Sequence, residues 1–384
     1  MSAPPRLVVL GLSITSSWGN GHATTYRGLV RGMSRIGYRT LFLERNMPWY
    51  EQNRDASNPV GCEVALYESL AELERLHAEE IRRADAVIVG SYVPEGVEVA
   101  RFVSATARCP TFFYDIDTPV TLARLAAGDT EYLAAEAIPR FDAYLSFTGG
   151  PTLDFIEREL GARRALPLFC SADPDSLAPA QGMPARELGY LGTYSDDRQP
   201  GVNELLVEPA LRLPEKRFVV GGPCYPKEIS WPPNVERIEH VAPGEHARFY
   251  GSQRYTLNVT RADMKRLGYS PSVRLFEAAA CAAPIITDRW QGIEEFFEPG
   301  REILLASTAN EVMSFLEEIP EHERRAIGAR ARRRFLKEHT GQRRAAQLDG
   351  YIRAARSAAT RITARVSTFK SHESVAIPEN PGDA

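Results

Sequence analysis

The chain has no long hydrophobic run, and its first residues do not form a long apolar segment. No stretch holds the roughly 18 uninterrupted apolar residues of a membrane span. The start MSAPPRLVVLGLS lacks the extended apolar core of a secretory signal. We therefore expect a cytoplasmic protein with no membrane span.

Cysteine is scarce, and positive charge is not in excess. The five cysteines are isolated, without the CxxC spacing of zinc or redox sites, and an odd number does not suggest a disulfide framework. The 46 lysines and arginines are outnumbered by 50 aspartates and glutamates, which leaves a formal net charge of -4. Because such a chain has no general attraction for polyanions, we do not expect nucleic acid as a partner.

Short apolar runs that alternate with helical patterns are abundant, and this alternation predicts parallel α/β sheets. At 384 residues the chain is long enough for two such domains. The strands predicted in the first part are Leu7–Leu12, Thr40–Leu43, Ala86–Gly90, Thr111–Tyr114 and Ala143–Phe147. Those predicted in the second part are Leu188–Leu191, Phe218–Gly221, Val235–Glu239, Tyr255–Val259, Pro284–Thr287 and Ile303–Leu305.

A change in composition separates the two parts. The segment CSADPDSLAPAQGMPARE is rich in proline, alanine and polar residues and has no strong periodicity, as is typical of a linker. The predicted organisation is a first Rossmann-like domain over 1–170, a linker over 171–187, a second Rossmann-like domain over 188–340, a strap helix over 341–358 and a disordered tail over 359–384.

The segment GYSPSVRLFEAAACAAPIITD is the most informative, because it places a single carboxylate, Glu277, in an alanine-rich helix. Ser270 suits the N-cap of that helix and Pro271 its first position. The amides of Ser272 and Val273 then face whatever precedes the helix. Helix starts of this kind bind phosphate, and a glutamate one turn later can accept hydrogen bonds from ribose hydroxyls. The segment predicts a nucleotide pocket.

Three arginines belong to the same prediction. Arg198 and Arg261 each follow a strand of the second domain, and guanidinium groups at that sheet edge match diphosphate oxygens. Arg274 lies one helical turn before Glu277, where it can contribute to the pocket. A simple i,i+3 ion pair between Arg274 and Glu277 is the alternative, and it requires no ligand.

The first loop, SITSSWGNGHATT, carries Gly19 and Gly21 ahead of His22, so its backbone can approach a ligand closely. With Glu44 after the second strand, a dinucleotide-binding interpretation is also available, and it predicts affinity for a nicotinamide cofactor. The glycines lie too far beyond the strand for that fingerprint, and Thr24 replaces its third glycine. A capped loop with a surface histidine is the remaining alternative.

Asp115 and Asp117, in YDIDTP, follow a strand at the edge where open parallel sheets bind ligands. Both are candidates for contact with a substrate, although Asp117 and Thr118 can also cap the next helix. Paired carboxylates bind hard cations, but no neighbouring residue completes a ligand set, and we predict no metal.

Together these features resemble the sugar-nucleotide-dependent GT-B glycosyltransferases. The resemblance lies in the two-domain pattern, the glycine-bearing first loop, and LFEAAACAAPIITD followed by EEFFEPGREILL. The phrases YDIDTP, YLGTYSDDRQP and NVTRADM are similar to the CgeB-like subgroup (spore maturation protein CgeB type), over most of the chain except its tail. The resemblance implies the GT-B architecture, with two doubly wound domains facing a cleft and C-terminal helices that return to the first domain.

The resemblance also implies residue roles on the donor side. Glu277 matches the glutamate that holds the donor ribose, and Ser272 and Val273 lie where backbone amides meet the diphosphate. Arg198 and Arg261 match, approximately, the basic phosphate clamps.

On the acceptor side, His22 resembles the loop histidine that acts as general base in some inverting members, and Asp115 or Asp117 can serve instead. Tyr269 stands where many retaining members carry an acid, so the stereochemistry does not carry over.

The expected function is that of a glycosyltransferase of hexosyl or N-acetylhexosaminyl type, without a metal or other cofactor. It would move a sugar from a nucleotide-diphosphate sugar, with a UDP-sugar favoured, to an acceptor that the sequence does not identify. A GT-B-type sugar-nucleotide epimerase and a non-catalytic sugar-nucleotide-binding or interaction protein are the alternatives. The sequence leaves the oligomeric state open.

Overall fold

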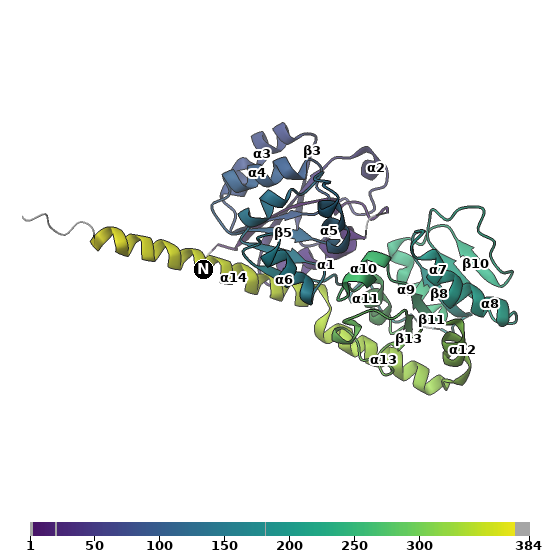
Figure 1. Ribbon diagram of the computed structural model, residues 1–384. Coiled ribbons are helices and arrows are strands. Elements are labelled where there is room, and N and C mark those ends of the chain that lie inside the picture. Colours follow the sequence, from purple (N-terminus) through teal and green to yellow (C-terminus); the bar gives the residue numbers. More distant parts are fainter. Residues whose placement is uncertain (1–2, 20, 181, 373–384) are drawn as a thin grey trace, which may run out of the picture.

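The computed structural model describes residues 3–19, 21–180 and 182–372, and it contains one parallel sheet in each half of the chain (Figure 1). The first sheet has the spatial order β3 (Glu63–Tyr67), β2 (Arg39–Arg45), β1 (Arg6–Gly11), β4 (Ala86–Gly90), β5 (Thr111–Asp115), β6 (Ala143–Ser146) and β7 (Ala165–Pro167). Its helices are α1 (His22–Arg35), α2 (Pro48–Glu51), α3 (Leu70–Arg82), α4 (Gly96–Thr106), α5 (Thr118–Ala126) and α6 (Pro151–Arg158).

The central strands of the first sheet are mainly apolar because both faces of the sheet are buried there. Leu7 and Val9 of β1 pack into one hydrophobic cluster, and Val8 and Leu10 pack into another on the opposite face. Edge strand β3 was not among the predicted strands. Four of its five residues are exposed or half-buried, and its apolar run, Val64–Tyr67, is only four residues long.

The second sheet repeats the design with the order β10 (Val235–Ile238), β9 (Phe218–Gly221), β8 (Arg186–Leu191), β11 (Gln253–Asn258), β12 (Ile285–Thr287) and β13 (Leu304–Leu305). Its helices are α7 (Gln199–Val202), α8 (Glu208–Arg212), α9 (His246–Gly251), α10 (Ala262–Leu267), α11 (Val273–Ala280), α12 (Ala309–Glu318) and α13 (Glu321–Glu338). A π-helical turn at Asn203–Val207 joins α7 to α8. All six predicted strands of this half are present, each close to its expected range.

In both sheets the strand order reverses beside the first strand of the domain, β1 or β8. Loops that leave the carboxyl ends of strands on either side of such a reversal enclose a crevice where ligands bind. The first loop follows β1 and the segment with Arg198 follows β8, so the two predicted ligand-binding loops occupy equivalent places in the two domains.

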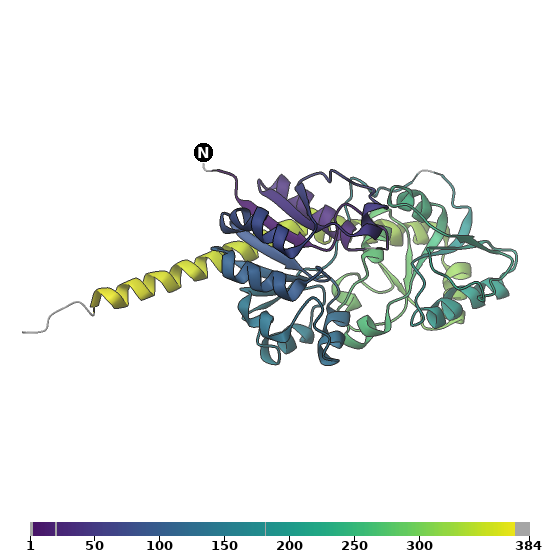
Figure 2. The same ribbon diagram turned by 90° about the horizontal axis from the view of Figure 1, so that it is seen from above.

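The chain returns to the first domain through its last helix, α14 (Gly341–His372), which lies along α1 and then extends away from the body (Figures 1 and 2). The contact is close because both helices have glycine there: a Cβ atom on Gly341 would lie 2.3 Å from the carbonyl oxygen of Gly28. The helix continues past residue 358, the predicted end of the strap, as far as His372. Of the tail predicted to be disordered, residues 373–384 lie outside the described residues.

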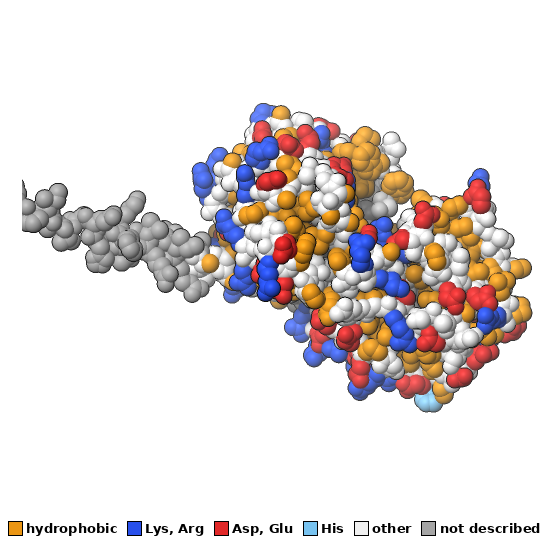
Figure 3. Space-filling model, in the orientation of Figure 1, with side chains coloured by type: hydrophobic (Ala, Val, Ile, Leu, Met, Phe, Trp, Pro, Cys, Tyr) orange, Lys and Arg blue, Asp and Glu red, His pale blue; other side chains and the backbone are white. Residues whose placement is uncertain are grey.

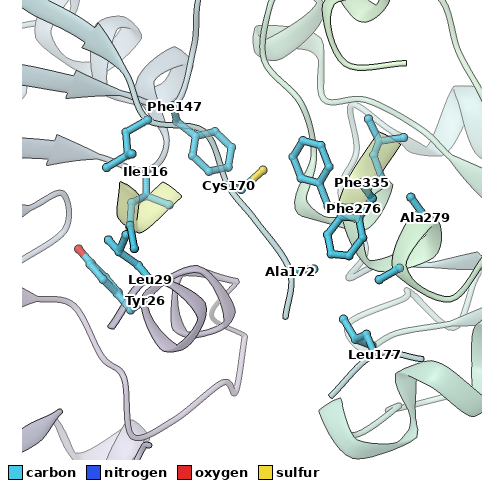
Figure 4. Packing of buried hydrophobic residues seen from close by; sticks show 14 of the residues in the cluster. Tyr26, Leu29, Ile116, Phe147, Cys170, Ala172, Leu177, Phe276, Ala279 and Phe335 are labelled. Carbon is cyan, nitrogen blue, oxygen red and sulfur yellow. The ribbon is translucent and has the colours of Figure 1, made fainter. Parts of the chain in front are cut away.

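A hydrophobic cluster also links the two domains (Figure 4). On the first-domain side it contains Leu29 and Ile116, and on the second-domain side Phe276 and Phe335, with Cys170 between them. Within the described part of the chain, no helix combines the length and the apolar character needed to cross a bilayer.

Candidate functional site

The carboxyl edges of the two sheets face each other across a cleft, which appears as a notch between the domains in Figure 3. The cleft consists of a larger cavity of about 480 Å³ and a smaller one of about 240 Å³. Both cavities are lined by residues of both domains, and they share Gly19, Gly21, Thr193, Arg198, Val273 and Arg274. A ligand can therefore extend continuously from one cavity into the other.

Almost every predicted site residue lines this cleft. The larger cavity adds His22, Asp117, Arg261 and Ser272 to the shared residues, and the smaller cavity adds Glu277. Residues separated by more than 250 positions in the sequence thus converge on one space, as the predicted two-domain organisation requires.

The helix with Glu277 starts two residues later than predicted. Ser272, not Ser270, is the N-cap of α11, and its hydroxyl accepts a hydrogen bond from the Arg274 amide. Ser270 is instead buried and hydrogen-bonded to Thr148 of the first domain. Because an interdomain contact holds Ser270 outside the helix, the free amide end of α11 shifts to Ser272 and Val273, the positions expected to meet phosphate.

Glu277 is buried, and the structure does not pair it with Arg274. Its Oε2 atom lies 3.5 Å from His246 Nδ1 and accepts a hydrogen bond of 3.1 Å from the Tyr250 hydroxyl. Burial alone raises the pKa of Glu277, but the nearby charges of His246 and Arg274 outweigh it and lower that pKa. The simple ion-pair alternative is therefore wrong. The Arg274 guanidinium lies over the Tyr190 ring, 5.3 Å from its centroid.

Arg198 is the predicted clamp with the clearest capacity for an anion. Its Nη2 donates to the carbonyl oxygen of Thr193 at 2.6 Å, while its Nε is buried with no hydrogen-bond partner in the described part of the chain. Burial, together with the positive charges of Arg274 and Arg261, lowers the pKa of Arg198. A cationic group that is half-dehydrated among like charges gains from a bound anion. Arg261 is more exposed and lies 3.8 Å from a carboxylate oxygen of Asp197.

The first loop is held in place by Glu44, which is completely buried. This carboxylate accepts hydrogen bonds from the backbone amides of Ile14 and Thr15 and from the hydroxyls of Ser13 and Thr15. Glu44 therefore has a structural role and does not face the cleft. This removes the residue on which the dinucleotide-binding interpretation depended.

The loop presents its glycines and His22 to the cleft. Gly19 has a φ of +59°, and a Cβ atom at Gly19 or Gly21 would meet nothing within 4 Å, so both leave open space for a ligand. His22 begins α1, and burial lowers its pKa to about 4. Its imidazole is therefore neutral near physiological pH, which is the state a general base requires.

Asp117, like His22, lines the larger cavity. It occupies the N-cap position of α5, yet its side chain does not cap the helix and instead accepts a hydrogen bond of 3.0 Å from the Tyr92 hydroxyl. The Tyr92 ring lies 5.4 Å from the ring of His22, centroid to centroid. Burial raises the pKa of Asp117, against the effects of Tyr92 and Arg261. The helix-capping alternative does not explain this side chain.

Asp115 does not reach the cleft, contrary to its predicted catalytic role. Its carboxylate is completely buried and accepts hydrogen bonds from the hydroxyls of Thr121 and Tyr144. Burial raises the pKa of Asp115 to about 6. It lies at the end of a strand, as predicted, but there its side chain points into the fold.

The side chains that contact predicted site residues include some that were not predicted, namely Tyr92, His246 and Tyr250. The last two are four residues apart in GEHARFYG, a spacing that puts both on one face of a helix. The tertiary structure alone reveals that this face meets Glu277. Tyr269 occupies the position at which many retaining glycosyltransferases carry an acid. Its ring packs against Gly150 and Gly292, so that a Cβ atom at either glycine would clash with it.

Solved structures with this arrangement of domains establish the fold. Sucrose-phosphate synthase from Thermosynechococcus elongatus superposes with a TM-score of 0.67 at 13% identity, over 92% of this chain and 100% of the other. An α-glucosyltransferase solved with UDP-glucose and DNA gives 0.70 at 10% identity, over 91% and 100%. The architecture is the GT-B fold. HepE from Anabaena, solved with UDP-glucose, has the same fold, with a TM-score of 0.65 at 13% identity over 91% and 99%.

The sequence comparisons concern the second domain. Residues 198–350 match the family described as glycosyl transferase-like, and this range begins at Arg198 and includes α11 with Glu277. A search of curated proteins found no match. The GT-B fold thus extends over both domains, while the family match covers most of the domain that carries the predicted donor residues, from Arg198 into α14.

Proposed function

We propose that this protein is a glycosyltransferase that moves a hexosyl or N-acetylhexosaminyl group from a nucleotide-diphosphate sugar, preferably a UDP-sugar, to an acceptor held by the first domain. The observation that carries the proposal is the convergence of Glu277, Arg198, Arg274 and the amide end of α11 on one cleft, opposite His22 and Asp117. The glycosyl transferase-like match and the GT-B neighbours solved with UDP-glucose support it.

On the donor side, the smaller cavity suits the nucleoside. A carboxylate with a lowered pKa, Glu277, accepts hydrogen bonds from the ribose hydroxyls. The diphosphate lies between the start of α11 and the side chains of Arg198 and Arg274. These groups stabilise the negative charge that develops on the diphosphate as its bond to the anomeric carbon breaks. Positive protein groups supply this stabilisation, and we propose that no metal is required.

On the acceptor side, an acceptor hydroxyl forms the new bond to the anomeric carbon and gives its proton to a base. Neutral His22 and the carboxylate of Asp117 both line the larger cavity and are the candidates for that base. Binding between two domains also excludes water, which would otherwise compete with the acceptor.

The proposal also includes the subgroup of the protein and its location in the cell. The phrases YDIDTP, YLGTYSDDRQP and NVTRADM support a place in the CgeB-like subgroup. A cytoplasmic location agrees with a nucleotide-sugar substrate. The epimerase alternative lacks comparable support, because the matched family and these neighbours are described as transferases or synthases.

Calorimetric titration of UDP, GDP, ADP, TDP and NAD into the parent, Glu277→Ala and Glu294→Ala proteins tests the donor pocket. Glu294 is exposed in the same domain and serves as the matched control. We expect one nucleoside diphosphate to bind the parent and the control equally and Glu277→Ala at least about tenfold more weakly, as for a lost hydrogen bond to a charged group. Equal binding to all three proteins, or binding of NAD alone, contradicts the proposal.

A further inference from the structure

Glu277 is held from one side by two residues of a single short helix. His246 and Tyr250 lie four positions apart on α9, so their side chains share one helix face. Both contacts fall on the same carboxylate oxygen, Oε2, at 3.5 Å from His246 Nδ1 and 3.1 Å from the Tyr250 hydroxyl. This arrangement fixes the carboxylate plane and leaves Oε1 for a ligand in the smaller cavity, which Glu277 and His246 both line.

The surroundings of His246 favour its charged form. Burial lowers the pKa of His246, but Glu277 and a hydrogen bond with the backbone of Val241 raise it to a net value above the ordinary one. The Nδ1 atom of His246 faces the Glu277 carboxylate at 3.5 Å, and a protonated imidazole can form an ion pair there that a neutral one cannot. Other ionisable groups around it include Arg274 on α11, which opposes its charge, Glu245 next to it in the chain, and Arg198 and His240, which line the same cavity.

We propose that His246, as an imidazolium, is a positioning residue of the nucleotide pocket: it orients Glu277 and keeps it ionised, and nucleotide binding weakens when His246 loses its proton. The inference rests on the proposed function, because it assumes that Glu277 binds the nucleotide. Two consequences follow from loss of the proton. The buried Glu277 carboxylate loses its nearest positive neighbour, and the cavity loses a positive charge that attracts the diphosphate.

The pH dependence of nucleotide affinity tests this role. UDP-glucose is the probe, because its two phosphates stay ionised over the range used, from about pH 5.5 to about pH 8.5. For the full-length parent we expect affinity to be highest at low pH and to fall about tenfold as pH rises through the titration of His246. His246→Gln should bind weakly at every pH, with a flat profile.

His322→Gln is the matched control, since His322 is exposed on α13 and lines neither cavity of the cleft. We expect this variant to keep the slope of the parent. Tyr250→Phe removes only the neutral donor and should weaken binding at all pH values by a similar factor, again with the slope of the parent.

An NMR titration of the His246 ring gives an independent readout that does not depend on the ligand. In the free Glu277→Gln variant, the midpoint should move down by about one pH unit relative to the parent. An unchanged midpoint, or a His246→Gln variant with the affinity and pH slope of the parent, overturns the positioning role alone. If the parent binds no nucleotide at any pH while the variant is equally inert, the proposed function fails with it.

Discussion

The two domains carry buried or half-buried carboxylates, in or behind the cleft, whose pKa values are shifted in opposite directions. In the second domain, Glu277 is next to His246 and Arg274, and its pKa is lowered. In the first domain, Asp115 and Asp117 receive hydrogen bonds from neutral hydroxyls, and burial raises the pKa of both. Burial acts in the same direction on all three, so the neighbouring charges make the difference.

This contrast suggests different roles for the carboxylates of the two domains. A carboxylate that stays ionised is a permanent acceptor, suited to the hydroxyls of a ribose. A carboxylate whose pKa lies closer to neutrality exchanges protons more readily, which suits the side of the cleft where an acceptor loses one. Asp117 meets both requirements of such a base, a raised pKa and contact with the cavity, whereas Asp115 meets only the first.

The largest expected effect comes from Asp117→Asn. If Asp117 is the base, turnover with donor and acceptor should fall about 10²- to 10⁴-fold, while donor affinity stays within about twofold because Asp117 lies outside the smaller cavity. Steady-state kinetics and donor calorimetry measure the two quantities. Asp154→Asn, at an exposed position of the same domain, is the control. Normal turnover in Asp117→Asn would shift the role to His22.

Asp115→Asn should change stability and its pH dependence. A pKa raised by burial from 3.8 to about 6 corresponds to about 3 kcal/mol in the free energy of unfolding. Because the ionised form is disfavoured in the fold, this cost is absent below about pH 4, grows as the pH rises to about 6 and is constant above. Urea unfolding at both ends of that range should show the parent losing this stability relative to the variant. Parallel profiles would show that Asp115 is not perturbed.

Arg198→Ala should weaken donor binding about 10- to 100-fold, because a partly dehydrated cation in the shared wall of both cavities is lost. Arg261→Ala should cost less, about two- to fivefold, since Arg261 is exposed and near Asp197. Calorimetric titration of the donor into both variants measures the two losses of affinity. A larger loss for Arg261 would place the diphosphate farther toward the larger cavity.

The smaller of the two expected effects on stability is that of Glu44→Gln, which should reduce the free energy of unfolding by about 1 to 2 kcal/mol as hydrogen bonds to the first loop weaken. Denaturant unfolding measures this change. Nucleotide affinity should change only as far as the first loop, which lines the cleft, becomes less ordered. NAD should bind neither the parent nor the Glu44→Gln variant. NAD binding that disappears in the variant would restore the dinucleotide-binding interpretation.

Much of the fold was predictable because local patterns decide it. Apolar runs such as Phe218–Gly221 became strands, since buried parallel strands need apolar side chains on both faces. Arg198 and Asp117, selected because each follows the carboxyl end of a predicted strand, both line the cleft. The β3 strand was missed because its apolar run is short and, at the edge of the sheet, mostly exposed or half-buried. The N-cap of α11 was misplaced because Ser270 satisfies the sequence rule for an N-cap as well as Ser272 does.

The sequence by itself therefore determined the α/β class, the two domains and the edge of each sheet where ligand-binding residues gather, because these follow from periodicity and strand direction. Only the tertiary structure decided which buried acids face the cleft and which charges stand beside them. Asp115 and Asp117 are two positions apart and alike in sequence, yet one is enclosed by Thr121 and Tyr144 and the other opens to the cavity. Likewise, His246 meets Glu277 only because α9 packs on α11. Protonation depends on such neighbours, and neighbours distant in sequence are known only from the fold.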